Sequence, residues 1–117
     1  MKASRFFRSF KFAAEGIVEA VKREQNMRMH LLAAAVVMIA GGATGLSYAE
    51  WLVVIVLIGG MISLELMNSA IERVVDLVTP EFHPLAKQAK DMAAGAVLVF
   101  AVASAIIGLL LFVPKWF

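Results

Sequence analysis

The sequence predicts an all-α integral membrane protein, with three transmembrane helices and an N-terminal amphipathic helix on the membrane surface. Hydrophobic residues make up 62% of its 117 positions, and charged residues only 17%. Three apolar stretches are each about as long as the roughly 20 residues that a helix needs to cross a bilayer. A soluble domain of this size has too much surface per unit volume to bury so many apolar side chains. We therefore expect a single membrane domain over residues 1–117.

Residues 1–25 are predicted to form the surface helix. Apolar side chains recur there at helical spacing: Phe6, Phe10, Ala13, Ala14, Ile17 and Val21. Lys2, Arg5 and Arg8 lie elsewhere on the helical wheel, which is the pattern of a helix lying in the cytoplasmic interface. The phenylalanines are interpreted as a lipid anchor. The basic residues fit either anionic lipid or a phosphate, and the periodicity alone does not separate the two.

The first two membrane helices are predicted over residues 29–49 and 50–78. The first contains a charge-free span from Leu31 to Ala49. The second opens on Ser47-Tyr48-Ala49-Glu50, which has the Ser-x-x-Glu form of a capping box. It ends before Pro80, because a proline disfavours helical geometry in the residue that precedes it. This helix therefore continues beyond the membrane into the cytoplasm.

The last helix is predicted over residues 84–113. Pro84 suits its first turn, where a backbone N–H would have no partner in any case. Its span, residues 92–113, contains no charged side chain.

The distribution of lysine and arginine predicts the orientation. Seven basic residues precede the first span: Lys2, Arg5, Arg8, Lys11, Lys22, Arg23 and Arg28. Three more lie between the second and third spans: Arg73, Lys87 and Lys90. The positive-inside rule then places the N-terminus in the cytoplasm and the C-terminus outside. Tyr48, Trp51 and Trp116 are expected at the outer interface, where amphipathic aromatic rings are favoured.

A polar stripe runs along the second membrane helix. Glu65, Asn68, Glu72 and Asp76 are separated by 3, 4 and 4 residues, so they share one helical face. Lipid cannot solvate such a face, and an ionisable residue within a membrane is a candidate functional site. Glu65 lies roughly 10 Å deeper than Glu72, at a depth that a lipid head-group hydroxyl could reach. We therefore take Glu65 as a candidate general base.

Several classes of site are excluded by the residues present. The chain has no cysteine, no Walker loop and no GxGxxG motif. Its two histidines, His30 and His83, lack a partner at metal-ligand spacing and are interpreted as polar residues of the interface. With a net charge of only +2, no nucleic-acid partner is expected.

A phosphate would therefore have to be held by Mg²⁺ on carboxylates and by basic side chains. The residues suited to this lie on the cytoplasmic side: Glu24, Glu72, Asp76, Lys90 and Asp91.

Structural interpretations stand beside these functional ones. Glu24 and Arg28 are four residues apart and could form a simple helical ion pair. Glu72 could form a surface bridge with Lys90, which would contribute about 0–1 kcal/mol. Asn68 could join helices, or it could orient the Glu65 carboxylate one turn away.

Three segments together resemble a known family. They are ExNMRxH at 24–30, ELMNSAIERVVDLV at 65–78 and HPLAKQAKDMAAGAVL at 83–98. The sequence is similar to the small prokaryotic diacylglycerol kinases, and most of all to their Gram-positive-type branch, the undecaprenol kinases. The similarity extends from SFKFAAEG at 9–16 to FVPK at 112–115.

The resemblance implies an ATP- and Mg²⁺-dependent lipid kinase in the bacterial plasma membrane. It would be a homotrimer with composite active sites at the cytoplasmic face. The implied substrate is the membrane alcohol undecaprenol, with diacylglycerol as the alternative. Two positions depart from relatives: Phe12 stands where some have tyrosine, and Ala14 where diacylglycerol-specific ones have tryptophan.

The resemblance also implies roles for individual residues. Glu65 would be the catalytic base, and Glu24 and Glu72 the metal ligands. Residues at the nucleotide site would be Glu24, Glu72, Asp76, Lys90, Asp91, Arg5, Phe12, Glu81 and His83. Residues at the lipid substrate would be Glu65, Asn68 and Arg28.

Two other functional classes fit part of the pattern. A small proton-coupled transporter could carry one membrane glutamate, but it would not need further acids and a lysine on the cytoplasmic side. A holin-like or structural oligomer would tolerate neutralisation of Glu24, Glu72 and Asp76 together.

Overall fold

The computed structural model describes residues 2–117, which form four α-helices. These are α1 (Lys2–Arg23), α2 (Gln25–Thr44), α3 (Tyr48–Val78) and α4 (Pro84–Trp116). By length and composition, α2, α3 and α4 can each cross a membrane. The predicted all-helical fold with three membrane-crossing helices is therefore confirmed.

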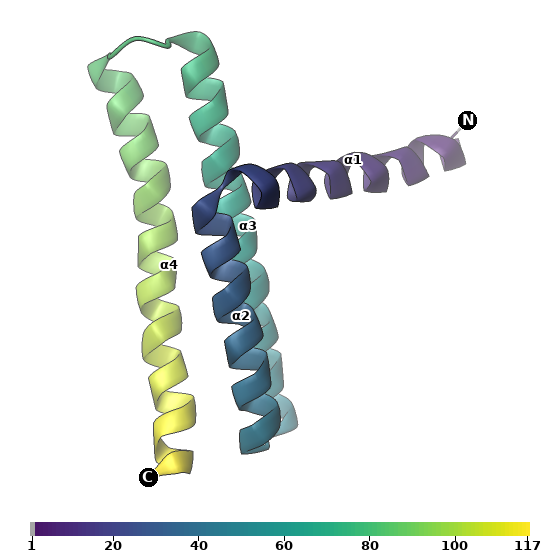
Figure 1. The fold of residues 1–117 in the computed structure, drawn as a ribbon, viewed down its shortest axis with the longest axis vertical. Helices are drawn as coiled ribbons and strands as arrows, with labels where there is room; N and C mark the ends of the chain where they lie inside the picture. The colour runs from purple at the N-terminus through teal and green to yellow at the C-terminus, as the bar shows by residue number, and fades with distance from the viewer. Residues whose placement is uncertain (1) are drawn as a thin grey trace.

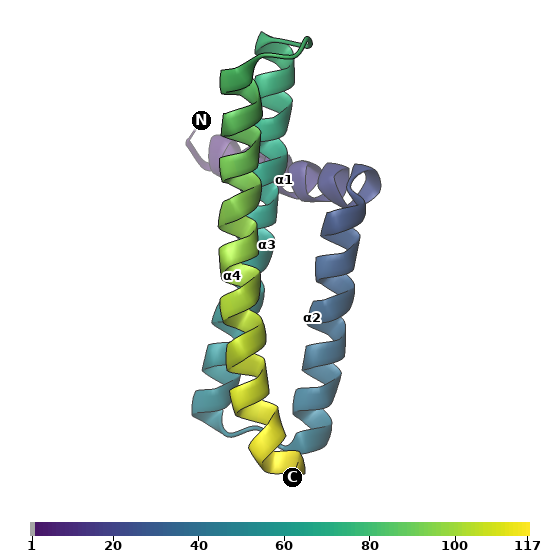
Figure 2. The same ribbon diagram turned by 90° about the vertical axis from the view of Figure 1, so that its left-hand side faces the viewer.

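The three long helices run side by side, and α1 projects sideways from them (Figure 1). The end of α1 that joins α2 meets the bundle, where Ala20 is buried. The connection between α3 and α4 lies at the end of the bundle nearer α1, and the C-terminus lies at the opposite end (Figure 2). Since α3 and α4 are longer than α2, they extend past the level of α1 (Figure 1).

The turn at the far end has the predicted capping box, but α2 ends earlier than predicted. The hydroxyl of Ser47 accepts from the Glu50 N–H at 3.2 Å, and Glu50 Oε1 accepts from the Ser47 N–H at 2.9 Å. Helix α2 ends at Thr44 rather than at residue 49 because Gly45 adopts a left-handed conformation, with φ of 80°. The N–H of Gly45 bonds to the carbonyl of Gly41, which closes the last turn.

Helix α4 runs three residues further than predicted, through Pro114 to Trp116. Proline has no N–H to bond back to the preceding turn, so Pro114 removes one backbone hydrogen bond, and in the last turn this leaves the rest of the helix intact. Two side chains hold this last turn against the other helices. The indole N–H of Trp116 donates to Thr44 Oγ1 at 2.9 Å, and Lys115 lies 3.1 Å from Glu50 Oε1.

Glycines allow close packing between the helices. A Cβ atom on Gly60 of α3 would lie 2.5 Å from the ring of Phe100 on α4. At Gly41 of α2, a Cβ atom would lie 2.8 Å from the Trp51 ring. Both approaches require a residue without a side chain, as is common where membrane helices pack closely.

Candidate active site

Glu65 is the most deeply buried charged residue of the described chain, with 2% of its surface exposed. It lies on α3 and faces α2, where His30 Nε2 is 3.4 Å from Glu65 Oε2. The sequence indicates no partner for either residue, whereas the structure pairs them. His30 lies on α2, six residues after Glu24, whereas Glu65 lies on α3. No spacing pattern within one helix could therefore have revealed the pair of His30 and Glu65.

One turn along α3, the buried side chain of Asn68 bonds to Glu72. Its Nδ2 donates to Glu72 Oε1 at 3.1 Å, so this amide group orients Glu72 rather than Glu65. Asn68 Oδ1 and the hydroxyl of Ser69 are buried and have no hydrogen-bond partner within residues 2–117. Buried polar atoms nearly always find a partner. These two oxygens therefore mark a place where a donor or a cation from outside the chain would be stabilised.

Glu24 connects the α1–α2 junction to α3. Its Oε1 is 3.2 Å from Arg73 Nη1, a nitrogen that also donates to the Ser69 carbonyl at 3.3 Å. The alternative pair of Glu24 with Arg28 does not form. Arg28 Nη1 instead donates to the carbonyls of Val21 and Lys22, at 2.9 and 3.0 Å, and so caps the end of α1.

These contacts gather three carboxylates around one region. Three ionisable side chains interact electrostatically with Glu65: His30, Glu72 and Glu24. They come from α2, from α3 and from the residue that precedes α2, at the end of the bundle where α1 joins it. We call Glu24, Glu65, Asn68 and Glu72 the acidic cluster. Because its members lie at positions 24 and 65–72, only the folded chain brings them together.

A second tier lies beyond the acidic cluster, towards the α3–α4 connection. Asp76 of α3 forms an ion pair with Lys90 of α4, and Lys87 pairs with Asp91 at 2.6 Å. The alternative bridge between Glu72 and Lys90 is therefore not formed. Both ion pairs are largely exposed, so water competes with them and a charged ligand could replace either partner of a pair.

Four predicted nucleotide-site residues belong neither to the acidic cluster nor to the ion pairs of the second tier within one chain. Arg5 and Phe12 are exposed on α1, on the part that projects away from the bundle (Figure 1). Glu81 lies in the α3–α4 connection. His83 caps α4, where its Nδ1 accepts from the Leu85 N–H at 3.1 Å. A site that used Arg5 or Phe12 would need α1 of a neighbouring chain.

The donor atoms of the cluster suit a hard cation that is shared with a ligand. Within residues 2–117, no group of three or more histidine, cysteine, aspartate or glutamate side chains is placed to hold a metal by itself. Mg²⁺ does not require one, because it keeps several waters and commonly uses one or two carboxylates together with phosphate oxygens. Glu24 and Glu72 each engage only Oε1 in the contacts given above. Their second oxygens and the unpartnered Asn68 Oδ1 are of the donor type that Mg²⁺ prefers.

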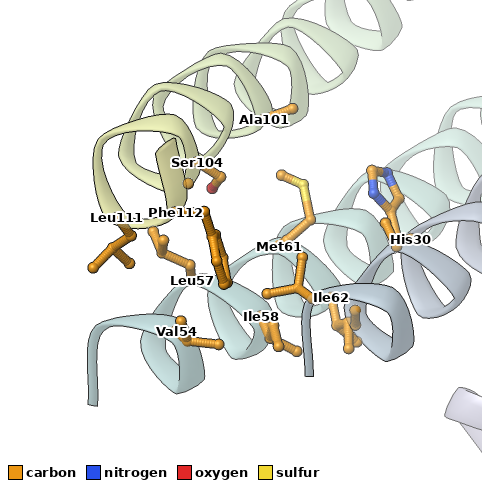
Figure 3. A pocket seen from close by; sticks show the side chains of 14 residues that line it. His30, Val54, Leu57, Ile58, Met61, Ile62, Ala101, Ser104, Leu111 and Phe112 are labelled. Carbon is orange, nitrogen blue, oxygen red and sulfur yellow. The ribbon is translucent and has the colours of Figure 1, made fainter. Parts of the chain in front are cut away.

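An apolar pocket of about 270 Å³ adjoins the cluster from the membrane side. It is formed by α2, α3 and α4, and its lining is apolar apart from His30 and Ser104. His30 lies at one end, whereas Val54 and Leu111 lie at the other (Figure 3). Small residues such as Ala33 and Gly108 leave space for the pocket. An apolar pocket that ends at His30, the contact partner of Glu65, can accommodate a hydrocarbon chain whose polar end lies near this pair.

Known proteins match nearly the whole chain. A family profile described as "Prokaryotic diacylglycerol kinase" matches residues 11–112. The undecaprenol kinase of Bacillus subtilis (strain 168) is 57% identical over 112 residues, which cover 96% of this chain and 91% of that protein. A diacylglycerol kinase of Synechocystis sp. is 39% identical, over 91% of this chain and 61% of that protein. One from Helicobacter pylori (strain J99) is 34% identical, over 81% and 74%.

Proposed function

Since the chain belongs to the prokaryotic diacylglycerol kinase family and is therefore a membrane lipid kinase, we propose that it phosphorylates undecaprenol with ATP. The product would be undecaprenyl phosphate. The 57% identity to an undecaprenol kinase over most of both chains supports this substrate. The observation that carries the proposal is the buried Glu65 carboxylate, which contacts His30 at the end of an apolar pocket and interacts electrostatically with two further acids.

Glu65 would remove the proton from the lipid hydroxyl as its oxygen attacks the γ-phosphorus. The depth of Glu65 in α3 suits an alcohol whose chain stays among the apolar side chains. Asn68 would act on the neighbouring Glu72, to which it donates a hydrogen bond. Arg28 would support the site from the end of α1 rather than meet the substrate directly, because its contacts are to backbone carbonyls.

Glu24 and Glu72 would hold Mg²⁺ together with the phosphates of ATP. When bound, this ion would offset charge on the phosphates and bring the γ-phosphoryl group into line with the lipid hydroxyl. Lys90 would exchange its ion pair with Asp76 for contact with the polyphosphate, since that pair is exposed. Asp76 and Asp91 would complete the nucleotide site with Glu81 and His83.

We further propose that the active unit is a homotrimer in the bacterial plasma membrane. The N-terminus would be cytoplasmic and α1 would lie on the inner surface as an amphipathic helix. Its phenylalanines are more than half exposed in the single chain, as lipid-facing side chains should be: Phe6, Phe7, Phe10 and Phe12. In such an assembly, α1 of one chain could bring Arg5 to the nucleotide site of the next, which the single chain does not achieve.

Side-by-side assays in mixed detergent micelles test the proposed substrate. The purified protein, Mg·ATP and either undecaprenol or diacylglycerol would be incubated, and phosphate transfer to each lipid measured. We expect the higher kcat/KM with undecaprenol. A clear preference for diacylglycerol would replace the proposed substrate with the one that the other family relatives are named for.

The same assay separates the kinase from a transporter, because micelles hold no ion gradient. Neutralising Glu24, Glu72 and Asp76 together tests the structural-oligomer alternative. We expect that triple variant to remain folded and to transfer no phosphate to lipid. If its transfer rate equalled that of the wild-type protein, the acids would have no part in catalysis.

A further inference from the structure

The pairing of Glu65 with His30 bears on a step that follows phosphoryl transfer. At 2% exposure, Glu65 has almost no access to water. If it accepts the proton of the lipid hydroxyl, it must lose that proton before the next turnover. A titratable side chain lies at contact distance: His30, whose Nε2 is 3.4 Å from Glu65 Oε2. The side chain of Asn68 is turned to Glu72 instead.

His30 also connects the buried Glu65 carboxylate to a part of the protein that is more accessible to solvent. Its side chain is 23% exposed, against 3% for the side chain of Glu65. It lies at the end of the apolar pocket, near the start of α2 and so near the end of the bundle where α1 joins (Figures 1 and 3). Imidazole is the one side chain whose ordinary pKa lets it both accept and release a proton near neutral pH. The carboxylates Glu24 and Glu72 also interact electrostatically with Glu65, so negative charge is concentrated on this side of the His30–Glu65 pair.

We propose that His30 is a positioning residue that takes the substrate proton from Glu65 and returns it to water. This inference rests on the proposed kinase function. In the transfer step, the alcohol O–H bond breaks and its proton bonds to Glu65, while the alcohol oxygen bonds to the γ-phosphorus and ADP departs. The O–H bond on Glu65 then breaks and the proton bonds to the neutral His30 ring. The resulting imidazolium loses a proton to interfacial water, which leaves Glu65 ionised for another cycle.

If the proton passes from Glu65 to His30 after phosphoryl transfer, the kinetics should show a feature that a purely structural role of His30 would not produce. In His30→Gln, the amide can still hydrogen-bond to Glu65 but cannot carry a proton. Rapid mixing with undecaprenol and ATP labelled at the γ-phosphate should give a burst of one labelled lipid per active site. Steady-state turnover after that burst should be roughly 100-fold slower than in the wild-type protein, the lower end of what a positioned proton-transfer group contributes.

Chemical rescue provides the matched control. In His30→Gly, added imidazole can occupy the space at the pocket end and carry the proton, so the steady-state rate should rise with imidazole concentration while the burst stays constant. In Glu65→Gly the base itself is missing, and imidazole should not restore the burst. The wild-type rate should be indifferent to imidazole.

The outcomes separate the inference from the function on which it rests. Steady-state turnover of His30→Gln within twofold of the wild-type rate would overturn the inference alone. So would loss of the burst together with the steady state in a variant that still binds Mg·ATP, because His30 would then act before the transfer. A wild-type protein that labels no lipid would overturn both proposals.

Discussion

A single methyl group at Gly60 should disturb the contact between α3 and α4 that aligns the second tier of the site. The two helices approach closely at this glycine: a Cβ atom would lie 2.5 Å from Phe100 Cζ, and 3.1 and 3.2 Å from the two adjoining ring carbons. Carbon atoms that are not bonded prefer about 3.5–4.0 Å. In Gly60→Ala, the ring or the helix must therefore move by about 1 Å.

The neighbouring residue provides the control. At Gly59, nothing lies within 4 Å of the position that a Cβ atom would take. Gly59→Ala should therefore stabilise the protein by about 0.5–1 kcal/mol, since alanine restricts the unfolded chain more than glycine does. Gly60→Ala should cost about 1–3 kcal/mol, the usual penalty for overpacking. The unfolding free energies of the two variants should thus differ by about 1.5–4 kcal/mol.

Reversible unfolding in mixed micelles, by titration with a denaturing detergent, measures this difference. A third variant tests its cause. Phe100→Leu shortens the side chain that meets Gly60, so Gly60→Ala should be less destabilising in that background, with a coupling energy of about 0.5–3 kcal/mol. Equal unfolding free energies for Gly59→Ala and Gly60→Ala, or additive effects in the double variant, would refute the packing of α3 against α4 described above.

Three further predictions concern the site. Lys90→Gln should raise the KM for ATP roughly tenfold, which corresponds to about 1.4 kcal/mol, and leave the KM for undecaprenol unchanged. Initial rates measured with both substrates varied test this. An unaltered KM for ATP would show that the assignment of Lys90 is wrong. Glu24→Gln should shift the Mg²⁺ titration of activity to higher concentration, whereas the exposed Glu15→Gln on α1 should not; superimposable titrations would exclude Glu24 as a ligand. Chelation of Mg²⁺ should stop lipid phosphorylation, and its return should restore the rate; activity that survives chelation would contradict the Mg²⁺ site.

Much of the fold follows from local patterns in the sequence. The length of each apolar stretch predicts a membrane-crossing helix. Ser47 and Glu50 predict their capping box because both partners lie within one turn. Two of the boundaries that differ from the prediction have other causes. Gly45 ends α2 early through its left-handed conformation, and the last turn of α4 is held by contacts to distant residues.

The site was predictable only where its residues share a helix. The stripe from Glu65 to Asp76 is read directly from the 3.6-residue repeat, but the repeat did not show that Asn68 would bond to Glu72 rather than to Glu65. The partners that cross between helices did not follow. His30 meets Glu65, and Arg73 meets Glu24, across sequence separations that no periodicity encodes.

The central claim is that a buried carboxylate on α3 deprotonates a lipid alcohol beneath Mg·ATP. Glu65→Gln tests it most directly, because the amide has nearly the same shape and cannot accept the proton. In a single-turnover experiment with undecaprenol and ATP labelled at the γ-phosphate, we expect the rate of lipid labelling to fall by about 100-fold or more. Nucleotide binding and the unfolding midpoint should not fall. Lipid labelling by Glu65→Gln at close to the wild-type rate would contradict the account.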